Sequence, residues 1–196
     1  MAEVPARMSG KPGGCVVTLG PGAANAMAGV ANAYLDRSPI LIVTADFPDN
    51  LSAQHTHQVI DLAAMFRPVT KGSIRLNPTG ASHQIRAALD LAQSGRPGPV
   101  HLNLSGAYAD HETEMVILPD TLRIGNKDKQ NNLLKAHNII KAANRPVIVA
   151  GLGLEPDRPY AELRELAENL QAPLIDTPKS KGTLPATHPL FGGTIG

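Results

Sequence analysis

The sequence predicts an α/β protein that contains two parallel-sheet domains. Short apolar runs, rich in β-branched residues, alternate with segments of helical spacing, as they do in βαβ units. Glycine and proline follow several of these runs, where a strand would turn into a helix. A polar stretch without a clear period, residues 105–130, separates the two patterns.

The first βαβ unit is predicted from residues 15–43. Residues 15–18 are β-branched and flanked by glycine, which favours a buried parallel strand. Gly20-Pro21-Gly22 then bends the chain, and small residues at helical spacing predict a helix over 23–35. Asp36 to Pro39 ends it, and residues 40–43 form a second apolar strand. Because ligands of such sheets lie beyond the carboxyl ends of the strands, residues 20–25 are a candidate ligand loop.

The rest of the first domain is predicted from the spacing of its apolar residues and from the residues that begin and end each element. Thr79 is expected to cap a helix whose apolar face contains Ile85, Ala88, Leu89 and Ala92. His101 could be a catalytic group, but we interpret it as a structural strand residue. The predicted elements are a loop over 46–56, a short helix over 57–66, a strand over 67–76 entered through Pro68, a helix over 79–94 and a strand over 100–104.

A second α/β pattern follows the polar stretch. Leu134, His137, Ile140 and Ala143 are phased at the helical repeat. The predicted elements are a helix over 131–144, a strand over 146–150, a glycine turn over 151–153, a helix over 160–170 and a strand that begins at 172–175.

Composition excludes several classes of protein. The net charge is +1 and there is no basic run, so neither nucleic acid nor an anionic membrane is an expected partner. One cysteine excludes an internal disulfide, and Cys15 is expected to pack as a small hydrophobe. No metal site is expected, because Asp110, His111, Glu112 and Glu114 fit a solvated linker better than a ligand set. No apolar run is long enough for a membrane span and no signal peptide is visible, which predicts a cytoplasmic protein.

The segment from Thr18 to Asp46, TLGPGAANAMAGVANAYLDRSPILIVTAD, closely resembles the pyrimidine-binding (PYR) domain of thiamine-diphosphate-dependent enzymes of the acetolactate synthase type. Ala24 replaces the threonine that is usual there. The sequences of residues 67–71, 94–102 and 142–153 are also similar to this family. The matching residues of the first segment are Thr18, Gly20, Pro21, Gly22, Ala23, Asn25, Ala33, Tyr34, Asp36 and Pro39.

The resemblance implies a domain organisation and a set of cofactor residues. Residues 1–108 would be a PYR domain that lacks its amino-terminal part, 109–128 a linker, and 129–196 the first half of a Rossmann-like central domain. Thiamine diphosphate with Mg²⁺, a small 2-oxo acid substrate and a homo-oligomer are implied for the parent enzyme. The turn at residues 151–153 resembles one that faces FAD in some members, or it is a plain βα corner. The residues implied to bind cofactor are Gly20, Pro21, Gly22, Asn25, Gln58, Lys71, Gly151 and Gly153.

The resemblance also implies what this chain lacks. The family's catalytic glutamate would precede Met1, and the sequence contains no G-D-G motif for the diphosphate and Mg²⁺. We therefore expect a fragment of a transferase or lyase that carries out carboligation or decarboxylation and is inactive alone. His57 and Val59 replace the usual Phe and Glu of the pocket.

The sequence leaves one alternative function open and disfavours another. A non-catalytic association or nucleotide-binding module derived from such an enzyme is the alternative. A dehydrogenase is disfavoured because no strand is followed by G-x-G-x-x-G. If both sheets are incomplete, exposed apolar surface and open edges predict self-association. Finally, Pro5 would disturb a helix interior.

Overall fold

The computed structural model describes residues 1–48, 57–113 and 129–195, which fall in two compact units, Met1–Ile124 and Gly125–Gly196. Every strand pair among these residues is parallel, which confirms the predicted α/β class. Residues 114–128, most of the predicted linker, lie outside the described residues, as does most of the predicted loop at 46–56.

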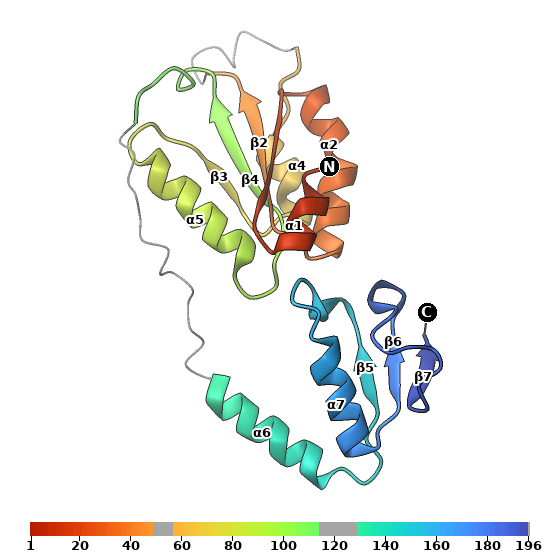
Figure 1. Ribbon diagram of the computed structural model, residues 1–196. Helices are drawn as coiled ribbons and strands as arrows, with labels where there is room; N and C mark the ends of the chain where they lie inside the picture. The colour runs from red at the N-terminus through yellow and green to blue at the C-terminus, as the bar shows by residue number, and fades with distance from the viewer. Residues whose placement is uncertain (49–56, 114–128, 196) are drawn as a thin grey trace. The chain divides into compact units, whose positions relative to one another are not determined.

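The first unit contains a four-stranded sheet in the order β1-β2-β4-β3, so β2 and β4 occupy its centre (Figure 1). In the register of the sheet, Cys15 pairs with Ile42, and Ile42 pairs with His101. The strands are β1 (Gly13–Val17), β2 (Ile40–Asp46), β3 (Ser73–Arg75) and β4 (Val100–Ser105).

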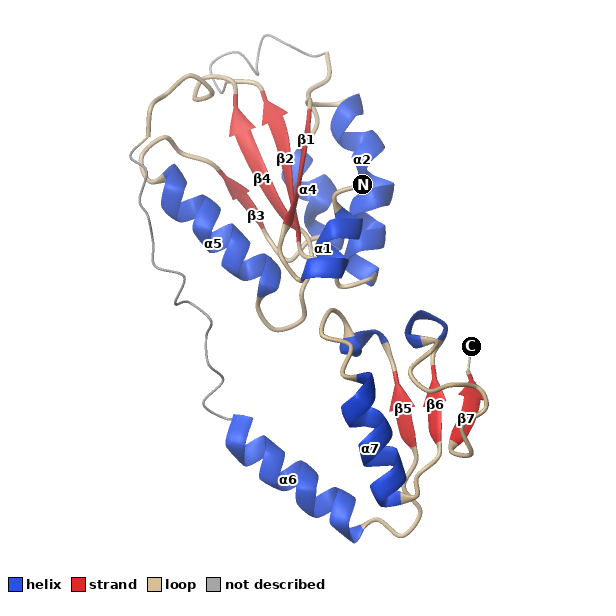
Figure 2. Ribbon diagram, viewed as in Figure 1, coloured by secondary structure: helices blue, strands red, loops and turns tan. Residues whose placement is uncertain are grey.

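Helices cover both faces of this sheet (Figure 2). On one face, Ile42 and Phe66 are fully buried in a cluster that includes residues of α2 and α4. On the other, Leu102 packs with Ala88 and Ala92 of α5. The helices in the described part of this unit are α1 (Glu3–Ser9), α2 (Pro21–Leu35), α4 (Leu62–Phe66) and α5 (Ala81–Gln93).

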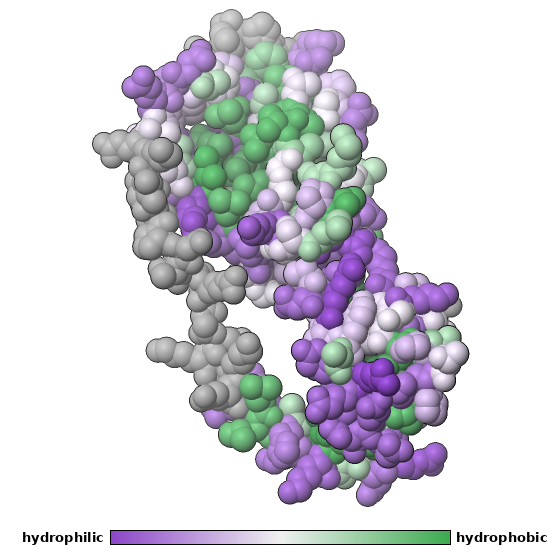
Figure 3. Space-filling view, in the orientation of Figure 1, coloured by the Kyte–Doolittle hydropathy of each residue, from purple (hydrophilic) through white to green (hydrophobic). Residues whose placement is uncertain are grey.

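β1 is less buried than its apolar composition predicts. Val16 is 78% exposed, and Cys15 and Val17 are half-buried against the α2 cluster. The reason is position, because β1 is an edge strand and Val16 lies on the face that α5 covers only in part. Figure 3 shows the apolar side chains that gather on this open part of the sheet.

The predicted helix over 57–66 is wrong in its first half. α4 begins only at Leu62, because the Asp61 side chain accepts a hydrogen bond from the backbone N–H of Ala64 at 2.8 Å and caps the helix there. Val59 and Ile60, which precede α4, are exposed.

The strand expected over 67–76 is also shorter than predicted. Residues Arg67–Val69 form a 3₁₀ turn (η1), with Pro68 near its start. Only Ser73–Arg75 pairs with β4. Proline fixes a helical φ and supplies no N–H, so it suits the first turn of a helix better than a strand.

α5 begins two residues later than predicted. Gly80, with φ +89°, is its N-cap, and no side chain caps the helix. Thr79 instead donates its backbone N–H to the side chain of Asn77. Ala88 and Ala92 are buried as expected, whereas Ile85 is 38% exposed.

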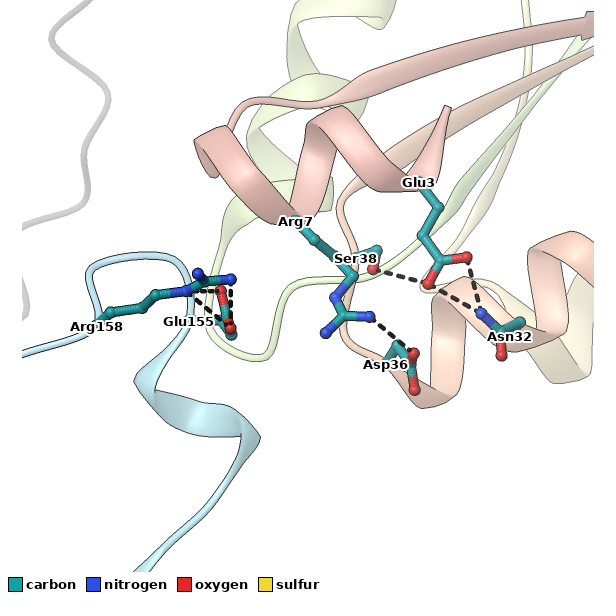
Figure 4. Close-up of polar contacts among 7 residues, drawn as sticks. All are labelled: Glu3, Arg7, Asn32, Asp36, Ser38, Glu155 and Arg158. Atoms are coloured by element: carbon teal, nitrogen blue, oxygen red, sulfur yellow. Dashed lines mark hydrogen bonds and ion pairs between the residues drawn. The ribbon is translucent and has the colours of Figure 1, made fainter. Parts of the chain in front are cut away.

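α1 contains Pro5, but outside the helix interior that proline would disturb. Pro5 lies in the first turn, where backbone N–H groups have no intrahelical acceptor, so the missing donor costs nothing. Polar contacts hold α1 against the end of α2 (Figure 4). Asn32 donates to both carboxylate oxygens of Glu3 at 2.8 and 2.9 Å, and Arg7 pairs with Asp36 at 3.4 Å.

The second unit contains a three-stranded sheet in the order β5-β6-β7. Leu163 of α7 packs on a small core of Ala150, Leu174 and Leu184. β7, which is half glycine, was not predicted. The elements are α6 (Lys129–Ala142), β5 (Ile148–Ala150), the 3₁₀ turn η2 (Leu152–Leu154), α7 (Tyr160–Leu170), β6 (Leu174–Asp176), the 3₁₀ turn η3 (Pro178–Ser180) and β7 (Phe191–Thr194).

Both helices of the second unit were predicted. The bounds of α7 agree with the prediction, and those of α6 differ by two residues at each end. The expected apolar stripe of α6 is nevertheless exposed: Leu134 is 64% and Ile140 37% accessible. Within the described parts of the chain, no helix combines the length and apolar character that crossing a bilayer requires.

Candidate functional site

The candidate site begins where β1 turns into α2. The strand ends at Val17, and Gly20 is the N-cap of α2 with φ +58° and ψ −119°. This backbone conformation is open to glycine and strained for other residues. Pro21 opens the helix, where its fixed φ is already helical. Because the turn follows a parallel strand, it lies at the carboxyl edge of the sheet, where ligands of α/β proteins bind.

Gln58 lies directly against Gly20, although 38 positions separate the two in the sequence. A Cβ atom added to Gly20 would lie 2.7 Å from the Cβ of Gln58 and 2.9 Å from its carbonyl oxygen. Gln58 itself has φ +64°, which is uncommon for a residue with a side chain. The fold therefore brings together two of the predicted cofactor residues through a contact that only glycine permits.

A second close contact shapes the same turn. A Cβ atom added to Gly22 would lie 2.4 Å from Cγ2 of Thr18, so the methyl group of Thr18 occupies the space beside the helix start. Gly20 is buried, whereas Pro21, Asn25 and Gln58 are exposed. The corner thus combines a packed glycine backbone with an accessible apolar ring and two accessible amide side chains. Such a surface can hold a flat heteroaromatic ring by contact and by amide hydrogen bonds.

The structure does not bring Lys71 to this corner. Lys71 precedes β3, and its backbone N–H donates to the carbonyl of Pro99 just before β4, so it lies at the amino edge of the sheet. Its Nζ donates to the carbonyl oxygens of Leu91 and Ser94 at the end of α5. Burial lowers the pKa of the Lys71 ammonium below its usual value. These contacts describe a lysine that stabilises a helix end.

Gly151 and Gly153 belong to the second unit, at the carboxyl end of β5. A Cβ atom on Gly151 would lie 3.9 Å from Oγ1 of Thr177, an ordinary contact, so this turn does not require glycine for space. Ser180 and Thr177 both donate to the carbonyl oxygen of Ala150, by Oγ at 2.6 Å and by the backbone N–H at 3.0 Å.

A pocket of about 280 Å³ lies at the same edge of the second unit, but neither glycine lines it. Asp176, fully buried at the end of β6, forms part of its wall. The Asp176 carboxylate accepts from Oγ1 of Thr194 at 2.6 Å and from the backbone N–H of Gly182 at 3.1 Å.

Known proteins resemble this chain in both units. Residues 1–65 match the thiamine pyrophosphate enzyme N-terminal TPP-binding domain, and residues 133–196 match the central domain of the same enzymes. The chain belongs to the thiamine pyrophosphate enzyme family. The candidate corner, Gly20 to Asn25 with Gln58, falls within the first matched region.

The relatives of this family member include acetolactate synthases. It is 37% identical over 97% of its length to the probable acetolactate synthase large subunit of Methanocaldococcus jannaschii. It is 32% identical over its whole length to the acetolactate synthase large subunit of Lactococcus lactis, and 30% identical to isozyme 3 of Escherichia coli. The chain spans about a third of the length of these relatives, 34% and 35% for the first two.

Two residues of the described sites were not singled out from sequence. Thr18 was noted only as part of a motif, and its contact with Gly22 depends on how the turn closes. Asp176 was missed, although a carboxylate that directly follows the apolar pair Leu174-Ile175 is a signal for the carboxyl edge of a parallel sheet.

Proposed function

We propose that this chain forms the pyrimidine-side part of a thiamine-diphosphate-dependent enzyme that acts on 2-oxo acids, by acetolactate synthase-like carboligation or by decarboxylation. The observation that carries the proposal is the contact of Gly20 with Gln58 at the carboxyl edge of the first sheet. The names of the relatives support carboligation, a transferase reaction, over the lyase reaction.

The residues of the corner fit the aminopyrimidine ring of thiamine. Gly20 and Gly22 have no side chains, so the ring can approach the backbone of this turn and lie against Pro21. The amides of Asn25 and Gln58 are accessible and can donate to ring nitrogens or accept from the amino group. When bound, thiamine diphosphate supplies the electron sink for cleavage next to the carbonyl of a 2-oxo acid. This chain's part is to bind and orient the ring, and we assign no acid–base residue to it.

Other features of the parent enzyme are proposed from the family resemblance. Mg²⁺ would be held with the diphosphate by a motif that this sequence does not contain. FAD against Gly151 and Gly153 rests on the family likeness of that turn, and Lys71 is better explained as a structural residue than as a cofactor contact. A homo-oligomer, a cytoplasmic location and the domain limits 1–108, 109–128 and 129–196 stay predictions from the sequence.

A segment exchange tests the function. The region of the Lactococcus lactis acetolactate synthase large subunit that matches this chain is replaced by residues 1–196, and acetolactate formation from pyruvate is measured with thiamine diphosphate and Mg²⁺. The proposal predicts an active hybrid and an inactive isolated chain. A hybrid that folds and assembles like the Lactococcus enzyme but makes no acetolactate would favour the alternative, a non-catalytic association or nucleotide-binding module.

A calorimetric titration of the isolated chain separates the two functions further. The pyrimidine-side proposal predicts no tight binding of thiamine diphosphate with Mg²⁺, because the diphosphate has no partner motif in this sequence. As a module, the isolated chain would instead bind FAD or another adenine nucleotide. Such binding, together with a hybrid that forms no acetolactate in the presence of thiamine diphosphate, would support a nucleotide-binding module.

A further inference from the structure

His101 is fully buried at the second position of β4, and its two ring nitrogens join this strand to β2 and β3. Nε2 is 2.9 Å from Oγ1 of Thr44 on β2, and Nδ1 is 2.7 Å from Oγ of Ser73 on β3. The ring also lies against Phe66, with centroids 4.7 Å apart. Thr44, His101 and Ser73 therefore form one hydrogen-bonded row across the sheet, on the face that α2 and α4 cover.

The row suits a neutral imidazole. A neutral ring donates from one nitrogen and accepts at the other, and each hydroxyl can take the complementary role. A protonated ring donates from both nitrogens, so the hydroxyl that donated to the unprotonated nitrogen must find a new acceptor. In the tautomer in which Thr44 is that hydroxyl, water cannot replace the acceptor, because Thr44 is fully buried. Protonation would thus leave a buried charge and a hydroxyl that has lost its acceptor.

Few groups around His101 stabilise the positive charge of a protonated imidazole. α2 and α4 contribute no charged side chain, and Phe66 of α4 covers the ring. Asp46 of β2 favours the charged form, but its carboxylate already accepts from Nδ2 of Asn103 at 2.9 Å. Arg75 of β3, in register with Asn103, adds a positive charge on this face. Burial outweighs Asp46 and lowers the pKa of His101 to about 4.

β3 is the strand that depends most on this row. It has three residues, lies at the edge of the sheet and, among the described residues, pairs with β4 alone. Besides the ladder of its three paired residues, two backbone hydrogen bonds at its ends join it to β4, from His101 N–H to the carbonyl of Gly72 and from Leu76 N–H to the carbonyl of Asn103. A strand this short is easily lost when one of its anchors is removed.

We propose that the Thr44–His101–Ser73 row is an acid-sensitive latch, which holds β3 in the sheet while the imidazole is neutral and releases it when the imidazole gains a proton. The unfolded chain takes up this proton near pH 6.5, whereas the folded chain resists it down to about pH 4. Stability is therefore lost as the pH falls through this window. The latch does not depend on the proposed function.

Urea denaturation of the full chain at pH 7 and pH 5 tests the latch. For the unaltered chain, His101 alone should raise the unfolding equilibrium constant about 20-fold between the two pH values. His101→Gln keeps a donor and an acceptor without a titrating ring, so this rise should disappear. His83→Gln is the matched control, because His83 is exposed on α5 of the same unit. An equal rise in all three proteins would overturn the proposal.

Hydrogen exchange tests the release of β3 even if His101→Gln does not fold. After correction for intrinsic rates, the Leu76 amide should lose protection at pH 5 before the amide of Val43 in β2. Ser73→Ala, a change at an exposed position, should lower the protection of Leu76 already at pH 7 and leave Val43 unchanged. Parallel loss of protection at Leu76 and Val43 in both experiments would show that no latch exists.

Discussion

The two sheets of this chain are built from similar sequence patterns but differ in how deeply they are buried. In the first, α2 and α4 pack on one face and α5 on the other, so Ile42 of the central strand β2 is completely covered. In the second, the described core lies on the side of α7, and Val147 and Val149 are 55% and 59% exposed. An apolar run therefore predicts a strand, whereas its burial depends on neighbours that the run does not encode.

The largest expected effect is a difference between the two sheets in the free energy of unfolding lost on truncation of a strand residue. Ile42→Ala removes a fully buried side chain between two helical layers and should lower the free energy of unfolding by about 3 kcal/mol. Val149→Ala, a similar truncation on the open face of β5, should cost less than about 1 kcal/mol. Urea denaturation measures both. Equal losses would contradict the contrast between the sheets.

Gly20→Ala should be the next most damaging change. It places a Cβ atom on a residue with φ +58° and against Gln58, and the combined strain should cost about 2 kcal/mol. Gly29→Ala is the matched control, because Gly29 is exposed in the middle of α2 with open space around it. The control should stabilise the chain by about 1 kcal/mol. Thermal unfolding of the two variants should therefore move in opposite directions.

A smaller loss is expected at the start of α4. Asp61→Ala removes the carboxylate that accepts from the Ala64 N–H, and should cost about 1 kcal/mol. Asp61→Asn keeps an acceptor at this position and should retain most of the stability. If both variants lose the same amount, the cap is not what begins α4.

The smallest effect on stability, with the clearest effect on association, is expected on the open face of the second sheet. Val149→Ser should change the free energy of unfolding by less than about 0.5 kcal/mol, since the side chain is already half exposed. Sedimentation velocity should show self-association of the unaltered chain that this variant reduces. A monodisperse unaltered chain would contradict the prediction that its apolar surfaces associate.

Local patterns predicted α7 correctly because its bounds are set by Pro159 before it and by residues Gln171 to Pro173 after it. They failed at 57–66, because Asp61 lies within the run of apolar residues and caps the helix there. The helix therefore begins at Leu62 and not at residue 57. They also failed for β1, since nothing in a five-residue run shows that it is an edge strand.

The candidate site was predictable only in part. The motif from Gly20 to Asn25 identified the turn, and resemblance to the family added Gln58. Their contact could not be derived from spacing, because it depends on where residues after β2 return to the sheet. Lys71 was grouped with them by the same resemblance, yet it lies at the opposite edge, where its ammonium binds the end of α5.

The measurement that tests the central claim most directly is acetolactate formation by the Lactococcus hybrid carrying Gly20→Ala, compared with the hybrid carrying Gly29→Ala. If the corner of Gly20 and Gln58 holds the pyrimidine ring, the first variant loses most of its activity and binds thiamine diphosphate more weakly, while the second keeps both. Equal activity and equal cofactor affinity in two correctly assembled hybrids would contradict the claim that this corner is the cofactor site.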